Sequence, residues 1–230
     1  MASEFRRFDP TSLRILLIEA APRILGPFHE SLATAAKAKL QSLGVEVHTG
    51  NPVEKVDGEG VMLKGERIRC KNVFWAAGVT PSPAAKWLGA EPDKAGRVKV
   101  LPDCSVPGHP DVFVVGDTAC FEVNGAALPG MAQPAIQQGR YVGRLIARRL
   151  RGEADPAPFT YFDKGNMATI SRNFAVMESF GMRMSGLLAK LAWAVVHIQF
   201  LVSGSQRSGT ALRWLRAILT RERLARIITE

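Results

Sequence analysis

An acidic residue, Asp117, closes the apolar segment DVFVVGD at residues 111–117. The four apolar residues of this segment include three valines, and a run of this kind that ends at a Gly-Asp pair is typical of a buried parallel strand meeting a ligand. In open α/β sheets the carboxyl ends of the strands bind cofactors, and a carboxylate there accepts hydrogen bonds from hydroxyl groups. Gly116 and Asp117 therefore predict a site for a sugar or a ribityl chain.

Three glutamines lie near the start of a helix that the apolar spacing predicts over residues 131–150. Gln133 and Gln137 are four residues apart and share a helical face, where their amides can donate hydrogen bonds to a carbonyl group of a ligand. Pro134 suits the first turn of a helix, which supports placing the helix start at the site. A solvated helical face is the alternative, and the spacing alone favours it.

A second acid, Glu19, ends the apolar run LRILLIE at residues 13–19. A helix follows over residues 30–43, Gly44 suits its C-terminal cap, and a strand begins at residue 45. Such a strand, helix and strand form a parallel crossover unit, in which an acid at the tip of the first strand accepts hydrogen bonds from ribose hydroxyls. Glu19 is therefore a candidate ribose ligand, although an exposed acid that simply ends a strand explains the same residues equally well.

Two small residues, Ala77 and Gly78, end an apolar strand expected over residues 72–79. Small residues let a backbone approach a flat ring or a pyrophosphate closely, although tight packing of two elements explains Gly78 alone as well. Before this strand, short alternating segments at residues 53–70 predict a β-meander. After it, the proline- and glycine-rich residues 79–110 predict a connection between domains. This connection is expected to hold a short helix at 84–88 and a strand at 97–101.

The charge of the chain is uneven. The net charge is +9, and the whole excess lies in residues 139–230, which hold 15 basic and six acidic residues. An excess placed there suggests an anionic partner for the tail, either lipid headgroups or nucleic acid. The three cysteines form no C-x-x-C motif and the four histidines form no cluster, which argues against a metal site, a redox dithiol, a disulfide framework and a catalytic triad. This cysteine usage fits a reducing compartment.

Two amphipathic segments make up the tail. Residues 187–202 place six apolar residues on one stripe but are too short for a spanning helix, which needs about twenty apolar residues. Residues 210–228 set leucines against five arginines, and Trp193 and Trp214 suit interfacial anchors. The tail therefore predicts helices lying on an anionic membrane surface, with core-facing or dimer-forming helices as the alternative. No nucleic acid is expected, because aromatic residues do not interleave with the basic ones.

Several motifs together resemble one known family: WAAGV at 75–79, GRVKV at 96–100, VPGHPDVFVVGDTA at 106–119, AQPAIQQG at 132–139 and DKGNMATI at 163–170. Their order resembles the type II NADH:quinone oxidoreductases, which are flavoproteins with two dinucleotide-binding folds. The resemblance implies an α/β fold class, as the C-terminal part of such a flavoprotein. It divides the chain into a partial NAD(H)-binding domain at 1–80, the C-terminal part of an FAD-binding domain at 81–180 and a basic amphipathic tail at 181–230.

The resemblance also implies residue roles around the cofactor FAD. Gly116 and Asp117 would contact the ribityl chain, and Ala132 and Gln133 would face the isoalloxazine ring. The dipole of the helix that starts there would favour the negative charge that develops on the reduced ring.

Further roles concern the quinone and NADH. Gln133 and Gln137 would act in catalysis by donating to a quinone carbonyl, and Lys164 would place a positive charge near the flavin or the quinone. Glu19, Ala77 and Gly78 would contact NADH. Glu19 would repel the 2′-phosphate of NADPH, which favours NADH, although nearby Arg23 would blunt that repulsion.

One departure from the family weighs against cofactor binding by this chain alone. The family has two glycine-rich phosphate loops, but no G-x-G-x-x-G motif occurs in these 230 residues. Such loops hold a pyrophosphate with backbone N–H groups and a helix N-terminus, so neither cofactor has its main phosphate anchor here. The chain thus looks like the C-terminal portion of such an enzyme, whether as a truncation or as half of a split protein.

Two hypotheses follow. The first is a peripheral membrane flavoenzyme on the cytoplasmic face of a bacterial inner membrane that passes electrons from NADH through FAD to a quinone. The second is a non-catalytic remnant or a membrane-associated interaction subunit without a bound cofactor. A homodimer and an upstream partner polypeptide are both compatible with either hypothesis. A flavin-dependent disulfide or ferredoxin reductase is disfavoured by the absent dithiol and by the basic apolar tail.

Overall fold

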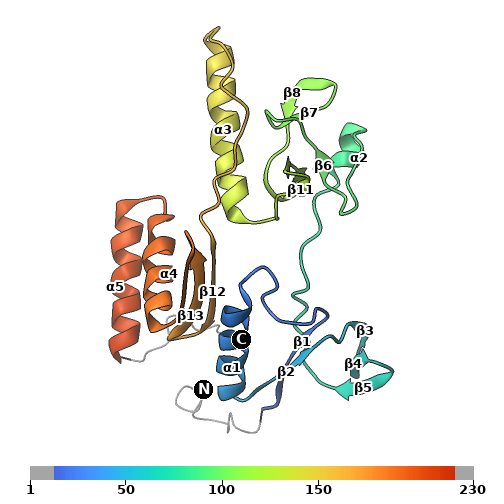
Figure 1. Ribbon diagram of the computed structural model, residues 1–230, viewed down its shortest axis with the longest axis vertical. Coiled ribbons are helices and arrows are strands. Elements are labelled where there is room, and N and C mark those ends of the chain that lie inside the picture. The colour runs from blue at the N-terminus through green and yellow to red at the C-terminus, as the bar shows by residue number, and fades with distance from the viewer. Residues whose placement is uncertain (1–12, 221–230) are drawn as a thin grey trace, which may run out of the picture. The chain divides into compact units, whose positions relative to one another are not determined.

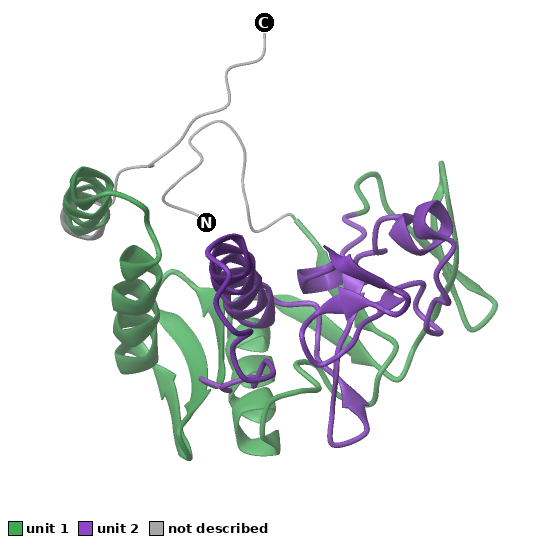
Figure 2. Cartoon of the chain, turned by 90° about the horizontal axis from the view of Figure 1, so that it is seen from above, with its two compact units in different colours: residues 1–73, 165–230 green, residues 74–164 purple. Residues whose placement is uncertain are grey.

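The computed structural model describes residues 13–220 of the chain. The chain forms two compact units, of which unit 1 comprises residues 1–73 and 165–230 and unit 2 comprises residues 74–164 (Figure 2). Residues 221–230, which include the end of the expected basic segment, lie outside the described residues.

Unit 1 begins with the expected crossover. Strands β1 (Ile15–Glu19) and β2 (Val45–Thr49) pair in parallel, and helix α1 (Glu30–Ser42) connects them. Gly44 follows the helix with a φ of +84°, a left-handed conformation that suits glycine after a helix end. The periodicity of the sequence therefore predicted this strand–helix–strand crossover correctly, to within two residues at each boundary.

A three-stranded antiparallel sheet forms the centre of unit 1. It consists of β12 (Asn166–Ser171), β13 (Phe174–Ser179) and β14 (Met182–Gly186). Alternate residues of a strand face opposite sides of a sheet, and β13 is buried on both. Val176 packs with Leu32 and Ala36 of α1, whereas Ala175 and Met177 pack with Ala189 of α4 (Leu187–Gln199). Figure 1 shows α1 and α4 on opposite faces of this sheet.

The remaining parts of unit 1 are a meander and a second tail helix. Strands β3 (Val53–Asp57), β4 (Gly60–Leu63) and β5 (Glu66–Arg69) form the expected antiparallel meander. Helix α5 (Gly204–Thr220) contacts α4 through Trp214, whose ring stacks on Trp193 with centroids 5.6 Å apart. Among the described residues, no helix is both long enough and apolar enough to cross a membrane.

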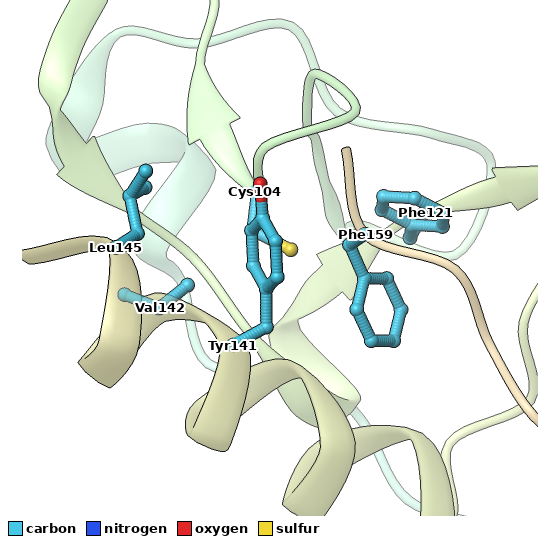
Figure 3. Packing of buried hydrophobic residues seen from close by; sticks show 6 residues of the cluster. All are labelled: Cys104, Phe121, Tyr141, Val142, Leu145 and Phe159. Atoms are coloured by element: carbon cyan, nitrogen blue, oxygen red, sulfur yellow. The ribbon is translucent and has the colours of Figure 1, made fainter. Parts of the chain in front are cut away.

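Unit 2 is built on short strands and one long helix, α3 (Ala132–Leu150). The buried face of α3 presents Tyr141, Val142 and Leu145 to Cys104, Phe121 and Phe159 (Figure 3). Phe121 and Phe159 meet edge to face, with ring centroids 5.1 Å apart. The other elements of unit 2 are α2 (Ala84–Leu88), β6 (Val98–Lys99), β7 (Ser105–Val106), β8 (His109–Phe113), η2 (Gly116–Thr118), β9 (Ala119–Cys120), β10 (Glu122–Val123) and β11 (Ala126–Ala127).

Two strand predictions between residues 72 and 117 were wrong. Residues 72–79 form no strand, and Phe74 is 93% exposed, because no other strand of the described chain pairs with this apolar run. The parallel strand expected within residues 111–117 instead spans His109–Phe113 and pairs antiparallel with β7. The parallel pairing expected there occurs after the turn, where β9 pairs with β6. Apolar runs predict extended backbone, but they do not identify the partner strand.

The compact units also divide the chain differently from the three expected domains. Residues 165–180, expected in the FAD-binding part, belong to unit 1. The expected tail from residue 181 is also continuous with unit 1, because β14 and α4 complete the packing around β13. The functional division into domains stays a prediction.

The burial of the cysteines leads to a testable prediction about thiol reactivity. Cys104 is fully buried, and burial together with the neighbouring Asp103 carboxylate raises the pKa of its thiol to about 12. Burial and the Asp93 side chain also raise the pKa of the Cys120 thiol, whereas Cys70 is partly exposed. Because a thiolate is the reactive form, Ellman's reagent at pH 8 should modify one thiol of the native chain rapidly and all three in guanidinium chloride.

Raising the pH to 9 should add no second fast thiol, because Cys104 and Cys120 are buried and burial raises the pKa of both thiols. The variant Cys70→Ser should show no fast reaction. A fast thiol in that variant would contradict the burial of Cys104 or of Cys120.

Candidate functional site

The expected ligand edge lies at a tight turn between β8 and β9. After β8 the chain passes the buried residue Val114 and turns through η2. Gly116 has a φ of +67°, which a residue with a Cβ atom adopts only with strain. A Cβ atom on Gly116 would also lie 3.0 Å from the Cβ atom of Ala135 in α3. Glycine therefore lets the turn lie directly against the helix.

A buried glutamine ties this turn to the helix. The Gly116 N–H donates a hydrogen bond to Oε1 of Gln138 at 2.7 Å, and Gln138 is 1% exposed. Gln138 lies three, four and seven positions before Tyr141, Val142 and Leu145, on the face of α3 that packs in the core. The sequence motifs indicated no role for Gln138. The signal was a polar residue within the apolar stripe of a helix, which indicates a buried hydrogen bond.

Asp117 lies beside the start of α3. The residue is exposed, and a Cβ atom on Gly130 would lie 3.4 Å from Cγ of Asp117. Gly130 directly precedes Met131, the N-cap residue of α3. The structure therefore brings the Asp117 carboxylate and the first turn of α3 to the same place.

The N-terminus of α3 has no side-chain cap. Met131 is extended, with φ of −141° and ψ of 159°, and its side chain bonds no backbone N–H group. Ala132 and Gln133 fill the first two helical positions, where an N–H group has no partner within the helix. Pro134 fills the third, so its missing N–H group costs the helix nothing. The exposed N–H groups and the helix dipole favour a negative charge at this end.

Gln137 contacts a backbone segment that comes after α3. Its Nε2 donates to the carbonyl oxygen of Phe162 at 2.9 Å, and its Oε1 accepts from the Phe162 N–H at 3.0 Å. Lys164, which is exposed, follows two residues later. In the same segment, burial and the neighbouring Asp163 carboxylate raise the pKa of Tyr161. The structure thus connects Gln137 and the Lys164 segment directly.

The residues expected to contact NADH belong to different units of the chain. Glu19 ends β1 in unit 1, where its Oε1 accepts from the Ala21 N–H at 2.8 Å. Nearby Arg23 donates to the carbonyl oxygen of Gly26 at 2.7 Å. Ala77 and Gly78 belong to the exposed irregular stretch that opens unit 2, and Gly78 has a φ of +112°. Within residues 13–220, no group of His, Cys, Asp and Glu side chains is arranged to hold a metal ion.

Comparisons with known proteins agree with the resemblance seen in the motifs. A family model described as "Pyridine nucleotide-disulphide oxidoreductase" matches residues 1–139. The type II NADH:quinone oxidoreductase Ndh of Mycobacterium tuberculosis is 42% identical over 98% of this chain and 50% of the relative. The enzyme NdhA of the same organism is 40% identical over 100% of this chain and 51% of the relative. The chain spans about half the length of the curated relatives that it matches.

Among solved structures, NDH2 from Plasmodium falciparum in complex with NADH aligns with a TM-score of 0.79 at 16% identity. The alignment covers 93% of this chain and 60% of that chain, and at this identity it concerns the fold alone. It confirms the α/β fold class expected from the sequence. Because the family model covers more than half of the 230 residues, the chain belongs to the pyridine nucleotide-disulphide oxidoreductase family.

Proposed function

We propose that this chain forms the C-terminal, flavin-ring side of an enzyme that passes electrons from NADH through FAD to a quinone at a membrane surface. One observation carries the proposal: the Gly116–Thr118 turn, with Asp117 exposed on it, lies against the first turns of α3. The named activity of the Mycobacterium tuberculosis relatives supports the choice of reaction.

The residues present fit one end of FAD and not the other. Asp117 is an exposed carboxylate beside an uncapped helix N-terminus, which suits ribityl hydroxyls and the electron-rich edge of the ring. No glycine-rich loop in the sequence suits the diphosphate. The chain therefore contributes the ring and ribityl contacts, and the diphosphate requires groups from elsewhere.

The chain's residues have separate tasks in this reaction. When bound, FAD supplies the hydride acceptor for NADH and the electron donor for the quinone. Asp117 accepts hydrogen bonds from ribityl hydroxyls, and the N–H groups of Ala132 and Gln133 favour negative charge on the ring by about 0.3 to 1 kcal/mol. The Gln133 amide donates to a quinone carbonyl, and Lys164 supplies positive charge on the same side. Gly116 has no Cβ atom, so the turn that carries Asp117 lies directly against Ala135 of α3.

The nucleotide side favours NADH over NADPH. One oxygen of Glu19 bonds the Ala21 N–H, and the carboxylate keeps a second oxygen for a ribose hydroxyl. The Glu19 carboxylate repels a 2′-phosphate, and one guanidinium nitrogen of Arg23 donates to the Gly26 carbonyl. Ala77 and Gly78 provide a backbone without large side chains for the remainder of the nucleotide.

A membrane surface on the cytoplasmic side is the partner of the tail. The outer face of α4 exposes large apolar side chains, with Leu188 71% and Val195 61% exposed. Lys190 lies over the Trp193 ring at 4.1 Å, and burial lowers the pKa of its ammonium group. Apolar residues with tryptophan and basic residues are typical of helices that lie in the interface of an anionic bilayer.

A second candidate function is a remnant or an interaction subunit that binds no cofactor. The missing phosphate loops favour it, and flavin binding separates the two candidates. Within either candidate, a second copy of the chain or a separate polypeptide remains a compatible partner.

Flavin titration of the purified chain tests the proposal. Quenching of flavin fluorescence should give dissociation constants for riboflavin and FAD within about threefold of each other, because the chain lacks the diphosphate anchor. The variant Asp117→Asn should weaken both about tenfold, because a hydrogen bond to a charged group contributes about 1.5 to 3 kcal/mol. Asp111→Asn, at a 94% exposed acid on β8, is the matched control and should change neither constant.

Absence of quenching by either flavin would favour the cofactor-free alternative. FAD binding more than tenfold tighter than riboflavin binding would show a diphosphate site within the chain and overturn the division of contacts.

Vesicle flotation tests the membrane partner. The double variant Leu188→Glu and Val195→Glu should abolish flotation with phosphatidylglycerol-containing vesicles, since burying each apolar side chain contributes about 1.5 to 3 kcal/mol. Both side chains point away from the sheet, so the fold should persist. Leu150→Glu, at a leucine of α3 that is 83% exposed, is the control and should float like the wild type. Equal flotation of all three proteins would exclude α4 as the contact.

A further inference from the structure

Two neighbouring glutamines of α3 bond two different backbone segments. Gln138 accepts from the Gly116 N–H on the segment before the helix, and Gln137 pairs with the Phe162 peptide on the segment after it. Both segments carry a charged residue of the proposed site close by, Asp117 in the first and Lys164 in the second. One helical turn therefore holds both ends of the site.

The Gln137 contact is a matched pair between an amide and a peptide group. A primary amide has a carbonyl acceptor and an NH₂ donor, and the Phe162 peptide offers a donor and an acceptor in return. Both bonds have good lengths, at 2.9 and 3.0 Å. The Phe162 carbonyl takes one of the two N–H donors of this NH₂ group, so the Gln137 amide is fixed by a backbone contact before any ligand binds. Gln133 differs, because within residues 13–220 its side-chain amide bonds no other group.

The segment held by Gln137 has little other regular structure. Residues 153–165 form neither helix nor strand. Phe159 is anchored, because its ring packs against Phe121 and Tyr141 and its N–H donates to the Pro102 carbonyl at 2.9 Å. Phe162 lies three residues later and its side chain is largely exposed. The two bonds to Gln137 therefore attach the chain to α3 at Phe162, between the packed residue Phe159 and Lys164.

On the basis of the proposed function, we propose that Gln137 and Gln138 are positioning residues and that Gln133 alone of the three glutamines donates to the quinone. Gln138 fixes the Asp117 turn against α3, and Gln137 fixes the backbone that carries Lys164. The spacing of four residues between Gln133 and Gln137 thus assigns them to one helical face but not to one task.

Amide hydrogen exchange of the full chain, followed by NMR, tests the assignment directly. Gln137→Met keeps the length of the side chain but removes both bonds, so exchange at the Phe162 amide should quicken about tenfold. Exchange at the Gly116 and Leu145 amides should stay as in the wild type. Gln138→Met should quicken exchange at Gly116 instead, and the matched control Gln133→Met should change none of the three. Unchanged exchange at Phe162 in Gln137→Met would overturn the proposal.

Binding of menadione, used as a soluble quinone, separates positioning from contact. Gln137→Met and Lys164→Met should each weaken binding about fivefold, and the double variant should bind no more weakly than the weaker single variant, because Gln137 acts through Lys164. Adding Gln133→Met to either Gln137→Met or Lys164→Met should weaken menadione binding further. If the losses in menadione affinity from Gln137→Met and Lys164→Met multiply in the double variant, Gln137 contacts the quinone itself. That result would overturn the proposal. A wild-type chain that binds no menadione would contradict the proposed function, while the exchange of Phe162 would still decide the role of Gln137.

Discussion

A hydrogen bond from the Gly116 backbone to the buried Gln138 amide holds the candidate site together. A buried polar group without a partner costs about 1 to 3 kcal/mol, so the turn and the helix favour staying in contact. The same face of α3 packs Tyr141, Val142 and Leu145 into the core of unit 2. The orientation of α3 in the core of unit 2 therefore determines where the turn that carries Asp117 lies. This coupling places a charged side chain beside a helix N-terminus without any direct bond between them.

The elements that depend on local periodicity could be predicted from the sequence. The β1–α1–β2 crossover, the meander and α3 appear where apolar spacing and glycine positions indicate them. The strands expected within residues 72–79 and 111–117 were mispredicted, because an apolar run does not specify its partner strand and pairing is a contact between distant parts of the chain. Among the candidate residues, Asp117 lies close to the start of α3, and their role in binding stays a prediction. The different partners of Gln137 and Gln138 could not be read from spacing, because they depend on backbone segments far away in the sequence.

The tail is part of unit 1 and not an appendage. Ala189 is fully buried against β13, so the first turn of α4 completes a layered core, while its larger side chains, such as Leu188, face outward. Small residues on one face let the helix approach the sheet closely, and large residues on the other remain available for a partner. A surface contact made by α4 would therefore be transmitted to β13, which packs on its other face against α1.

The stacked indole rings of Trp193 and Trp214 give this helix pair an optical property of its own. Rings with centroids 5.6 Å apart and 16° between their planes lie close enough for their electronic transitions to couple. Such coupling depends on the distance and the angle between the rings, so the near-ultraviolet circular dichroism of the two indoles changes when the rings separate. The contact between α4 and α5 can thus be followed through the signal of its own two tryptophans, without an added label.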